Sequence, residues 1–111
     1  MIKDKRHNKR RHLIEYFDVV NVKNNQVIGH LVDITAEGMM IISKDLIPEN
    51  TTSFLEIKLP KELKRDHADY IDFEAKVLWT RKNINPGYYS IGFQIISITE
   101  ENLKIIKETI L

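Results

Sequence analysis

The amino-acid sequence predicts a mainly β, all-β-class domain of six short antiparallel strands, followed by a C-terminal α-helix. Three observations favour this fold class. Apolar runs are short and separated by turn residues, apolar and polar residues alternate in the clearest runs, and the hydrophobic period becomes helical only near the end. The 111 residues, 42% hydrophobic and 30% charged, have the size and composition of one globular domain with its own core.

The strands are expected in six apolar runs, which cover residues 13–22, 26–34, 39–43, 53–59, 71–79 and 89–95. The fifth run is the clearest, because Ile71, Phe73, Val77 and Trp79 all fall on its odd positions, as in a strand with one buried face. This register predicts that Trp79 belongs to the core, and Phe93 in the sixth run is expected there for the same reason.

Turn residues separate these runs. Asn24 and Asn25 are expected to form a two-residue hairpin turn, because asparagine tolerates the left-handed conformation that such turns require. Loops are expected at residues 47–50 and 61–69, and the Asn-Pro-Gly sequence at 85–87 is expected to turn the fifth strand into the sixth.

The segment 33–38, Asp-Ile-Thr-Ala-Glu-Gly, interrupts the apolar pattern between the second and third strands. Asp33 and Thr35 have short side chains that can hydrogen-bond to nearby backbone, and Gly38 permits a positive φ. A turn or a bulge is therefore expected at this segment.

The C-terminal helix is expected to begin after Thr99, whose hydroxyl can cap it. Glu100 and Glu101 suit the positive N-terminal end of a helix. The apolar residues of the segment share one helical face, and they are Leu103, Ile106 and Ile110.

Six short antiparallel strands without room for crossover helices favour a small barrel or sandwich, closed so that strand edges are hidden. Gly29 and Gly92 lie inside the expected strands, where glycine fits the sharp bends that closure needs.

The charge is distributed unevenly. Residues 1–12 contain six lysines and arginines against one aspartate, a net charge of +5, so the other 99 residues sum to −4. We expect a flexible basic arm at 1–12 and a folded domain at 13–111. Such an arm suits an anionic ligand or partner, although it is also the composition of a solvated terminus.

Composition disfavours several cellular settings and chemistries. The chain has no cysteine, which excludes disulfides and thiolate metal sites and fits the cytoplasm. No stretch approaches the roughly 18 apolar residues of a membrane span, so no membrane insertion is expected.

Catalytic patterns are missing as well. The four histidines lack the spacing of metal ligands, and no serine lies in a nucleophile-elbow sequence. Glu56, Asp72 and Glu74 fall on the polar side of alternating strands, where solvation explains them. We therefore expect no catalytic residue, no metal, no cofactor and no enzymatic activity.

The basic arm and the 33–38 segment offer complementary chemistry. Arg6, Arg10 and Arg11 carry planar guanidinium groups that suit phosphate oxygens or the O6/N7 edge of guanine. The Asp33 carboxylate can accept hydrogen bonds from N1–H and N2–H of guanine, and the Thr35 hydroxyl can hold the turn or reach a ligand. Together they could recognise a guanine nucleotide.

With these residues the chain resembles the PilZ domain family. One family signature, Arg-x-x-x-Arg before the first strand, is matched by Arg6 and Arg10; the other, Asp/Asn-x-Ser/Thr-x-x-Gly after the second strand, is matched by 33–38. Residues 75–79 and 89–93 also resemble later strands of the family, so that the similarity covers roughly residues 6–98.

The resemblance implies a six-stranded antiparallel PilZ-type β-barrel that binds cyclic di-GMP and signals through an effector protein. By the same resemblance, Arg6 with Arg10 or Arg11 would hold guanine edges and phosphates. Asp33 and Thr35 would read a guanine, and Gly38 would allow close backbone approach.

Two other functions remain open at this point. The first is a degenerate PilZ domain that binds a partner protein and no nucleotide. The second is single-stranded nucleic-acid binding, against which the acidic body and the absence of an evident exposed aromatic row both argue.

Overall fold

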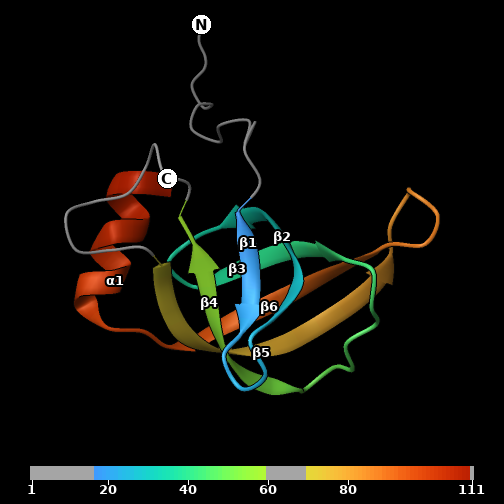
Figure 1. Cartoon of the computed structure of the whole chain (residues 1–111), viewed down its shortest axis with the longest axis horizontal. Coiled ribbons are helices and arrows are strands. Elements are labelled where there is room, and N and C mark those ends of the chain that lie inside the picture. The colour runs from blue at the N-terminus through green and yellow to red at the C-terminus, as the bar shows by residue number, and fades with distance from the viewer. Residues whose placement is uncertain (1–16, 60–69, 111) are drawn as a thin grey trace, which may run out of the picture.

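Six strands pair edge to edge until they close on themselves. The computed structural model describes residues 17–59 and 70–110, apart from the side chains of the last two residues. Every neighbouring pair is antiparallel, in the closed order β1-β2-β3-β6-β5-β4 (Figure 1). The strands are β1 (Asp18–Asn21), β2 (Gln26–Ile34), β3 (Gly38–Ser43), β4 (Thr52–Lys58), β5 (Tyr70–Lys82) and β6 (Tyr89–Ser97). The expected six-stranded antiparallel barrel is confirmed.

The first strand is shorter than expected within the described residues. Phe17 and Val22 lie outside β1, and the expected strand residues 13–16, like the expected loop at 61–69, fall outside the described part of the chain.

The turn between β1 and β2 has four residues, 22–25, so the expected two-residue turn is wrong. Asparagine side chains hold the wider turn, because Asn21 Oδ1 accepts from the Lys23 N–H and Asn24 Oδ1 from the Gln26 N–H. Asn25 does adopt the left-handed conformation, with a φ of 60°.

The barrel interior is filled by apolar side chains from all six strands. The fully buried members include Val19, Leu31, Ile41, Leu55, Ile57, Ile71, Val77 and Ile91. Phe93 belongs to this core, as expected. Alternation along each strand directs one side chain in two toward this interior and leaves the rest for the outer surface.

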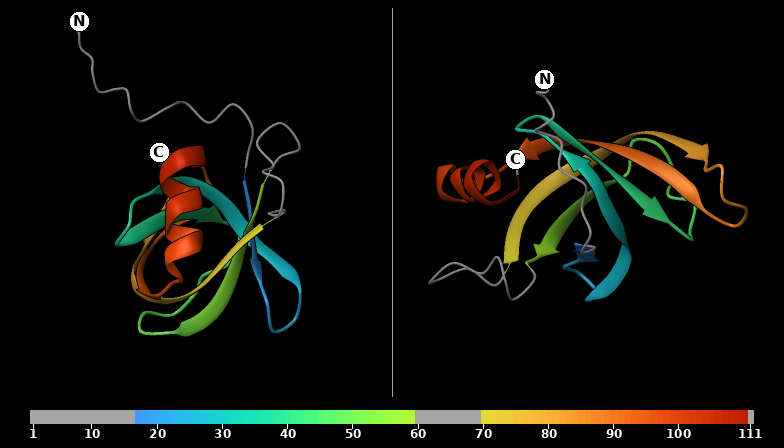
Figure 2. Two further views of the ribbon diagram at one scale, coloured as in Figure 1. Left: turned by 90° about the vertical axis from the view of Figure 1, so that its left-hand side faces the viewer. Right: turned by 90° about the horizontal axis from the view of Figure 1, so that it is seen from above.

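The C-terminal helix covers one end of the barrel, opposite the β5–β6 hairpin tip (Figures 1 and 2). Thr99 caps α1 (Glu100–Ile105) by accepting from the Asn102 N–H, as expected. The Asn102 amide also donates to the backbone and side-chain oxygens of Asp72 on β5, at 3.0 and 2.8 Å. Ile106, which begins the π-helical segment η2 (Ile106–Ile110), is fully buried and joins the core.

Two of the four register shifts among the described strands of the barrel reverse the inside–outside alternation and thereby shape one outer face. In β2 the register shifts between Leu31 and Asp33, and in β5 it shifts between Val77 and Trp79. A bulge adds one residue to a strand, so that two consecutive side chains face the same side. In β2, Ile34 lies beyond the bulge and returns to the interior.

Candidate functional site

The segment 33–38 forms a turn that is held by its own polar groups. The Thr35 hydroxyl accepts hydrogen bonds from the N–H groups of Glu37 and Gly38, both at 3.2 Å. It also donates to the Gly38 carbonyl at 3.4 Å, and the Thr35 N–H donates to the same carbonyl at 2.8 Å. Of the two roles expected for this hydroxyl, the structure shows the turn-holding one.

The turn is also fixed to the neighbouring strand β6. The Ile95 N–H donates to the Glu37 carbonyl at 2.9 Å. A Cβ atom on Gly38 would lie 2.7 Å from the Phe93 carbonyl oxygen, so that a side chain at Gly38 would collide with backbone. The turn is therefore held firmly against β6.

Of the two reasons expected for glycine at position 38, the positive φ is wrong. Gly87, in the β5–β6 turn, is the only glycine with a positive φ among the described residues. Gly38 is needed because two backbones approach closely, not because of a left-handed conformation.

The bulge in β2 determines where Asp33 points. Leu31 and Ile34 are both buried, whereas Val32 and Asp33 between them are exposed. Strict alternation from Leu31 would have turned Asp33 inward. The extra residue instead brings its carboxylate to the outer face, beside the turn and opposite Met40 of β3.

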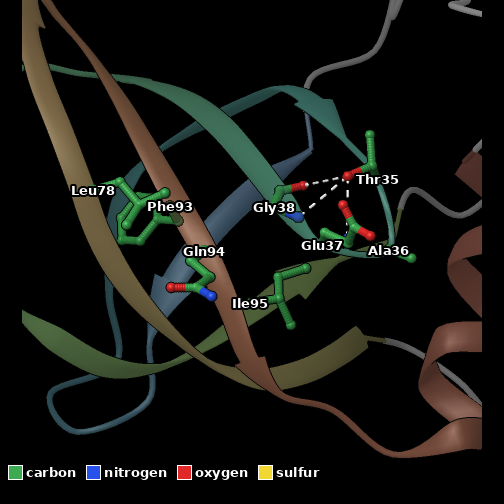
Figure 3. Close-up of a pocket in the computed structure, with 8 residues that line it drawn as sticks. All are labelled: Thr35, Ala36, Glu37, Gly38, Leu78, Phe93, Gln94 and Ile95. Atoms are coloured by element: carbon green, nitrogen blue, oxygen red, sulfur yellow. Dashed lines mark hydrogen bonds between the residues drawn. The ribbon is translucent and has the colours of Figure 1, made fainter.

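An open depression lies against the turn, with a volume of about 640 Å³. Its lining comes from the turn, from β6 and from Leu78 of the β5 bulge, as Figure 3 shows, and consists of Thr35, Ala36, Glu37, Gly38, Leu78, Phe93, Gln94 and Ile95. This volume falls in the range of small-molecule sites, about 300–1,000 Å³. Because the depression is open, a ligand there would lie on the outer face against a backbone-rich wall and not inside a cavity.

Trp79 lies on the same outer face, contrary to the expectation that it belongs to the core. It is half-buried and pairs with Gly92 of β6, which in turn pairs with Met40. A Cβ atom on Gly92 would lie 2.2 Å from the indole, so that the ring occupies the space that a side chain there would take. The Arg81 guanidinium lies 4.6 Å from the indole centroid.

Gly92, Trp79 and Arg81 thus form a layered stack, with a cation above an aromatic ring. The Gly92–Trp79 pair is two residues along β6 from Gln94, which lines the depression. At about 3.3 Å per residue, the offset is roughly 7 Å. This stack is not evident in the sequence, because the alternation of β5 continues through a bulge that period-2 patterning cannot detect.

The site residues expected from the sequence fall into two groups. Asp33, Thr35 and Gly38 come together at the end of β2 and the start of β3. Arg6, Arg10 and Arg11 lie outside the described residues, as does the whole expected arm at 1–12.

Two further features bear on the chemistry of the described residues. No three His, Asp or Glu side chains in the ranges 17–59 and 70–110 are grouped so as to hold a metal ion. No helix in those ranges is long and apolar enough to cross a membrane.

Comparison with protein families matches residues 4–111 to the PilZ domain. Among solved structures, the Bacillus subtilis Inhibitor of motility (MotI/DgrA) superposes with a TM-score of 0.67 at 17% sequence identity. The alignment covers 86% of this chain and 46% of that one, so the chain spans about half the length of that protein. No curated protein matches the chain.

Proposed function

Because the chain belongs to the PilZ domain family, we propose that it is a receptor for cyclic di-GMP that passes the signal to a partner protein. The observation that carries this proposal is the gathering of signature residues on one barrel face. The Thr35–Gly38 turn lines an open depression, Asp33 lies next to this turn near the end of β2, and all of them lie on the part of the chain that matches the family.

The chemistry of this face suits a guanine base. The exposed Asp33 carboxylate accepts from the N1–H and N2–H edge of guanine, which presents two donors side by side. Thr35 contributes by keeping the turn rigid, since its hydroxyl is engaged with Glu37 and Gly38. A fixed turn needs little ordering when the ligand binds, which favours affinity.

The Trp79–Arg81 stack supplies a second contact. Guanidinium planes stack on bases and also donate to phosphate, and an indole beneath the cation holds it in place. In the proposed complex, one guanine of cyclic di-GMP contacts Asp33. The other guanine, or a phosphate, contacts Arg81.

The arginines of residues 1–12 complete the proposed site. Arg6, with Arg10 or Arg11, grips guanine edges and phosphates as the arm folds over the ligand. Each charged hydrogen bond contributes about 1.5–3 kcal/mol. Three or four such bonds offset the ordering of a few arm residues, which costs about 1–2 kcal/mol for each residue.

Thermal unfolding with and without cyclic di-GMP tests the proposal, with GTP and cyclic di-AMP as controls. At about a hundredfold excess over the dissociation constant, a specific ligand adds roughly 2.7 kcal/mol of stability. For a domain of this size the midpoint then rises by about 10 °C. A rise confined to cyclic di-GMP supports the receptor function. No rise at high ligand concentration would favour the degenerate PilZ module that binds only a protein.

A further inference from the structure

A second outer surface lies across the barrel from the Thr35–Gly38 turn. In the closed strand order, two strands separate β4 from β3 in either direction, so the outer faces of β4 and β3 point away from each other. The surface around β4 is therefore independent of the candidate ligand site.

Register arranges this surface in two rows of neighbouring residues. The first row crosses four strands through Val27, Val20, Glu56 and Asp72. The second row runs through Val22, Phe54 and Glu74, in which the Val22 N–H donates to the Phe54 carbonyl and Phe54 pairs with Glu74. We call these seven residues the acidic–apolar face.

One half of this face is apolar, and three of its four residues are open to solvent. Phe54 is 62% exposed, Val27 52% and Val22 45%. Val20, which pairs with Val27, is buried without belonging to the barrel's interior cluster. Single exposed apolar residues are ordinary on protein surfaces, but a contiguous group marks a site of interaction.

The other half is acidic. Glu56 and Asp72 are directly opposed across β4 and β5, and Glu74 follows two residues later in β5. Like charges directly opposite one another in a sheet are destabilising. Lys58 and Lys76 lie one pair beyond each end of the group, and thus at its margins.

We infer that the acidic–apolar face docks a segment of a partner protein, in which an aliphatic side chain lies next to at least two lysines or arginines. The aliphatic side chain covers Phe54 and its valine neighbours. The cations lie against Glu56 and Glu74 and beside Asp72, whose carboxylate also accepts a hydrogen bond from the Asn102 amide, and they relieve the repulsion between the opposed carboxylates. Charge complementarity across the two halves selects this partner over an acidic or a wholly apolar one.

A peptide titration tests the inference on the full chain without cyclic di-GMP, so that its outcome does not depend on the proposed ligand. The probe is a synthetic 12-residue peptide of alternating leucine and lysine. Two control peptides replace lysine by glutamate or leucine by serine. Backbone amide NMR shifts locate the binding, and calorimetry measures its affinity.

The matched protein variants are Phe54→Ser and Ile84→Ser. Ile84 is 94% exposed at the β5–β6 hairpin tip, away from the face, so its substitution removes a comparable apolar group. We expect Phe54→Ser to weaken the binding of the leucine–lysine peptide at least fivefold and Ile84→Ser to leave this affinity unchanged. Both control peptides should bind at least fivefold more weakly than the probe, and Glu56→Gln should weaken the probe while lowering its salt dependence.

Equal affinity for Phe54→Ser and the unsubstituted chain would overturn the inference, provided that their unfolding midpoints agree. Changes in amide chemical shift confined to the outer face that carries Trp79 and the Thr35–Gly38 turn would also overturn it. So would binding that appears only after Lys3, Lys5 and Lys9 are replaced by glutamine, since the chain's own basic segment would then be the occupant.

Discussion

The two outer faces of the barrel differ in what determines them. The face around the Thr35–Gly38 turn depends on backbone geometry: two bulges, a turn closed by a threonine hydroxyl, and two glycines that allow close approach. The acidic–apolar face depends on side chains of the β1–β4 and β4–β5 pairs, which keep their register, although register shifts adjoin Val20 in the β1–β2 pair and Glu74 in the β5–β6 pair. Substitutions on the first face should therefore disturb shape and ligand binding, whereas those on the second should disturb only association.

The largest effect on ligand binding is expected at the arm. Arg10→Ala should weaken the binding of cyclic di-GMP at least tenfold, because it removes charged hydrogen bonds of about 1.5–3 kcal/mol each. Calorimetric titration measures the change. Arg10→Lys keeps the charge but loses the planar fork, so it should restore only part of the affinity. An unchanged dissociation constant for Arg10→Ala would rule out this geometry and direct attention to Arg6 with Arg11.

A smaller loss is expected at the aromatic stack. Trp79→Leu should weaken the binding of cyclic di-GMP about fivefold, because it removes the indole that holds the Arg81 guanidinium in place for the ligand. Gly92→Ala is the matched variant, because it keeps the tryptophan and displaces its ring. Calorimetry should find both variants weakened. A loss in Trp79→Leu alone would mean that the ring's position on Gly92 is immaterial.

The turn should respond mainly in stability. Thr35→Val removes the hydroxyl that accepts two hydrogen bonds and donates one, and it should lower the free energy of unfolding by about 1 kcal/mol. The unfolding midpoint should then fall by about 5 °C. Thr35→Ser keeps the hydroxyl and serves as the control. Equal midpoints for the valine and serine variants would show that the hydroxyl does not hold the turn.

The smallest effect is expected on the acidic–apolar face. Phe54→Ser should change the free energy of unfolding by no more than about 0.5 kcal/mol, because the side chain is 62% exposed. Its affinity for cyclic di-GMP should equal that of the unsubstituted chain. Chemical denaturation and calorimetry check the two values, and a substantial loss in either would remove the contrast between the faces.

Much of the fold was predictable, because it rests on local patterning. The alternation in β4 and in β5 as far as Val77, the Asn-Pro-Gly turn and the Thr99 cap each have a local physical cause, and the structure bears them out. The turn between β1 and β2 was predicted with the wrong length, since the asparagine side chains bond the backbone of a wider loop.

The candidate site was only partly predictable. The 33–38 segment was located because short polar residues and glycine mark turns. The outward position of Trp79 and the contact of Gly38 with the β6 backbone were not, because both depend on a partner strand far away in the sequence. A bulge changes which face a residue occupies without leaving a distinct local signal, so Trp79 was assigned to the core.

An NMR titration with cyclic di-GMP tests the central claim most directly. Trp79 is the chain's single tryptophan, so its indole N–H gives one resolvable signal for the proposed face. We expect that signal and the amides of residues 35–38 and Gln94 to shift together, while those of Val22, Phe54 and Glu56 stay in place. Shifts gathered on β1 and β4, or binding that leaves the turn and Trp79 unchanged, would contradict the account.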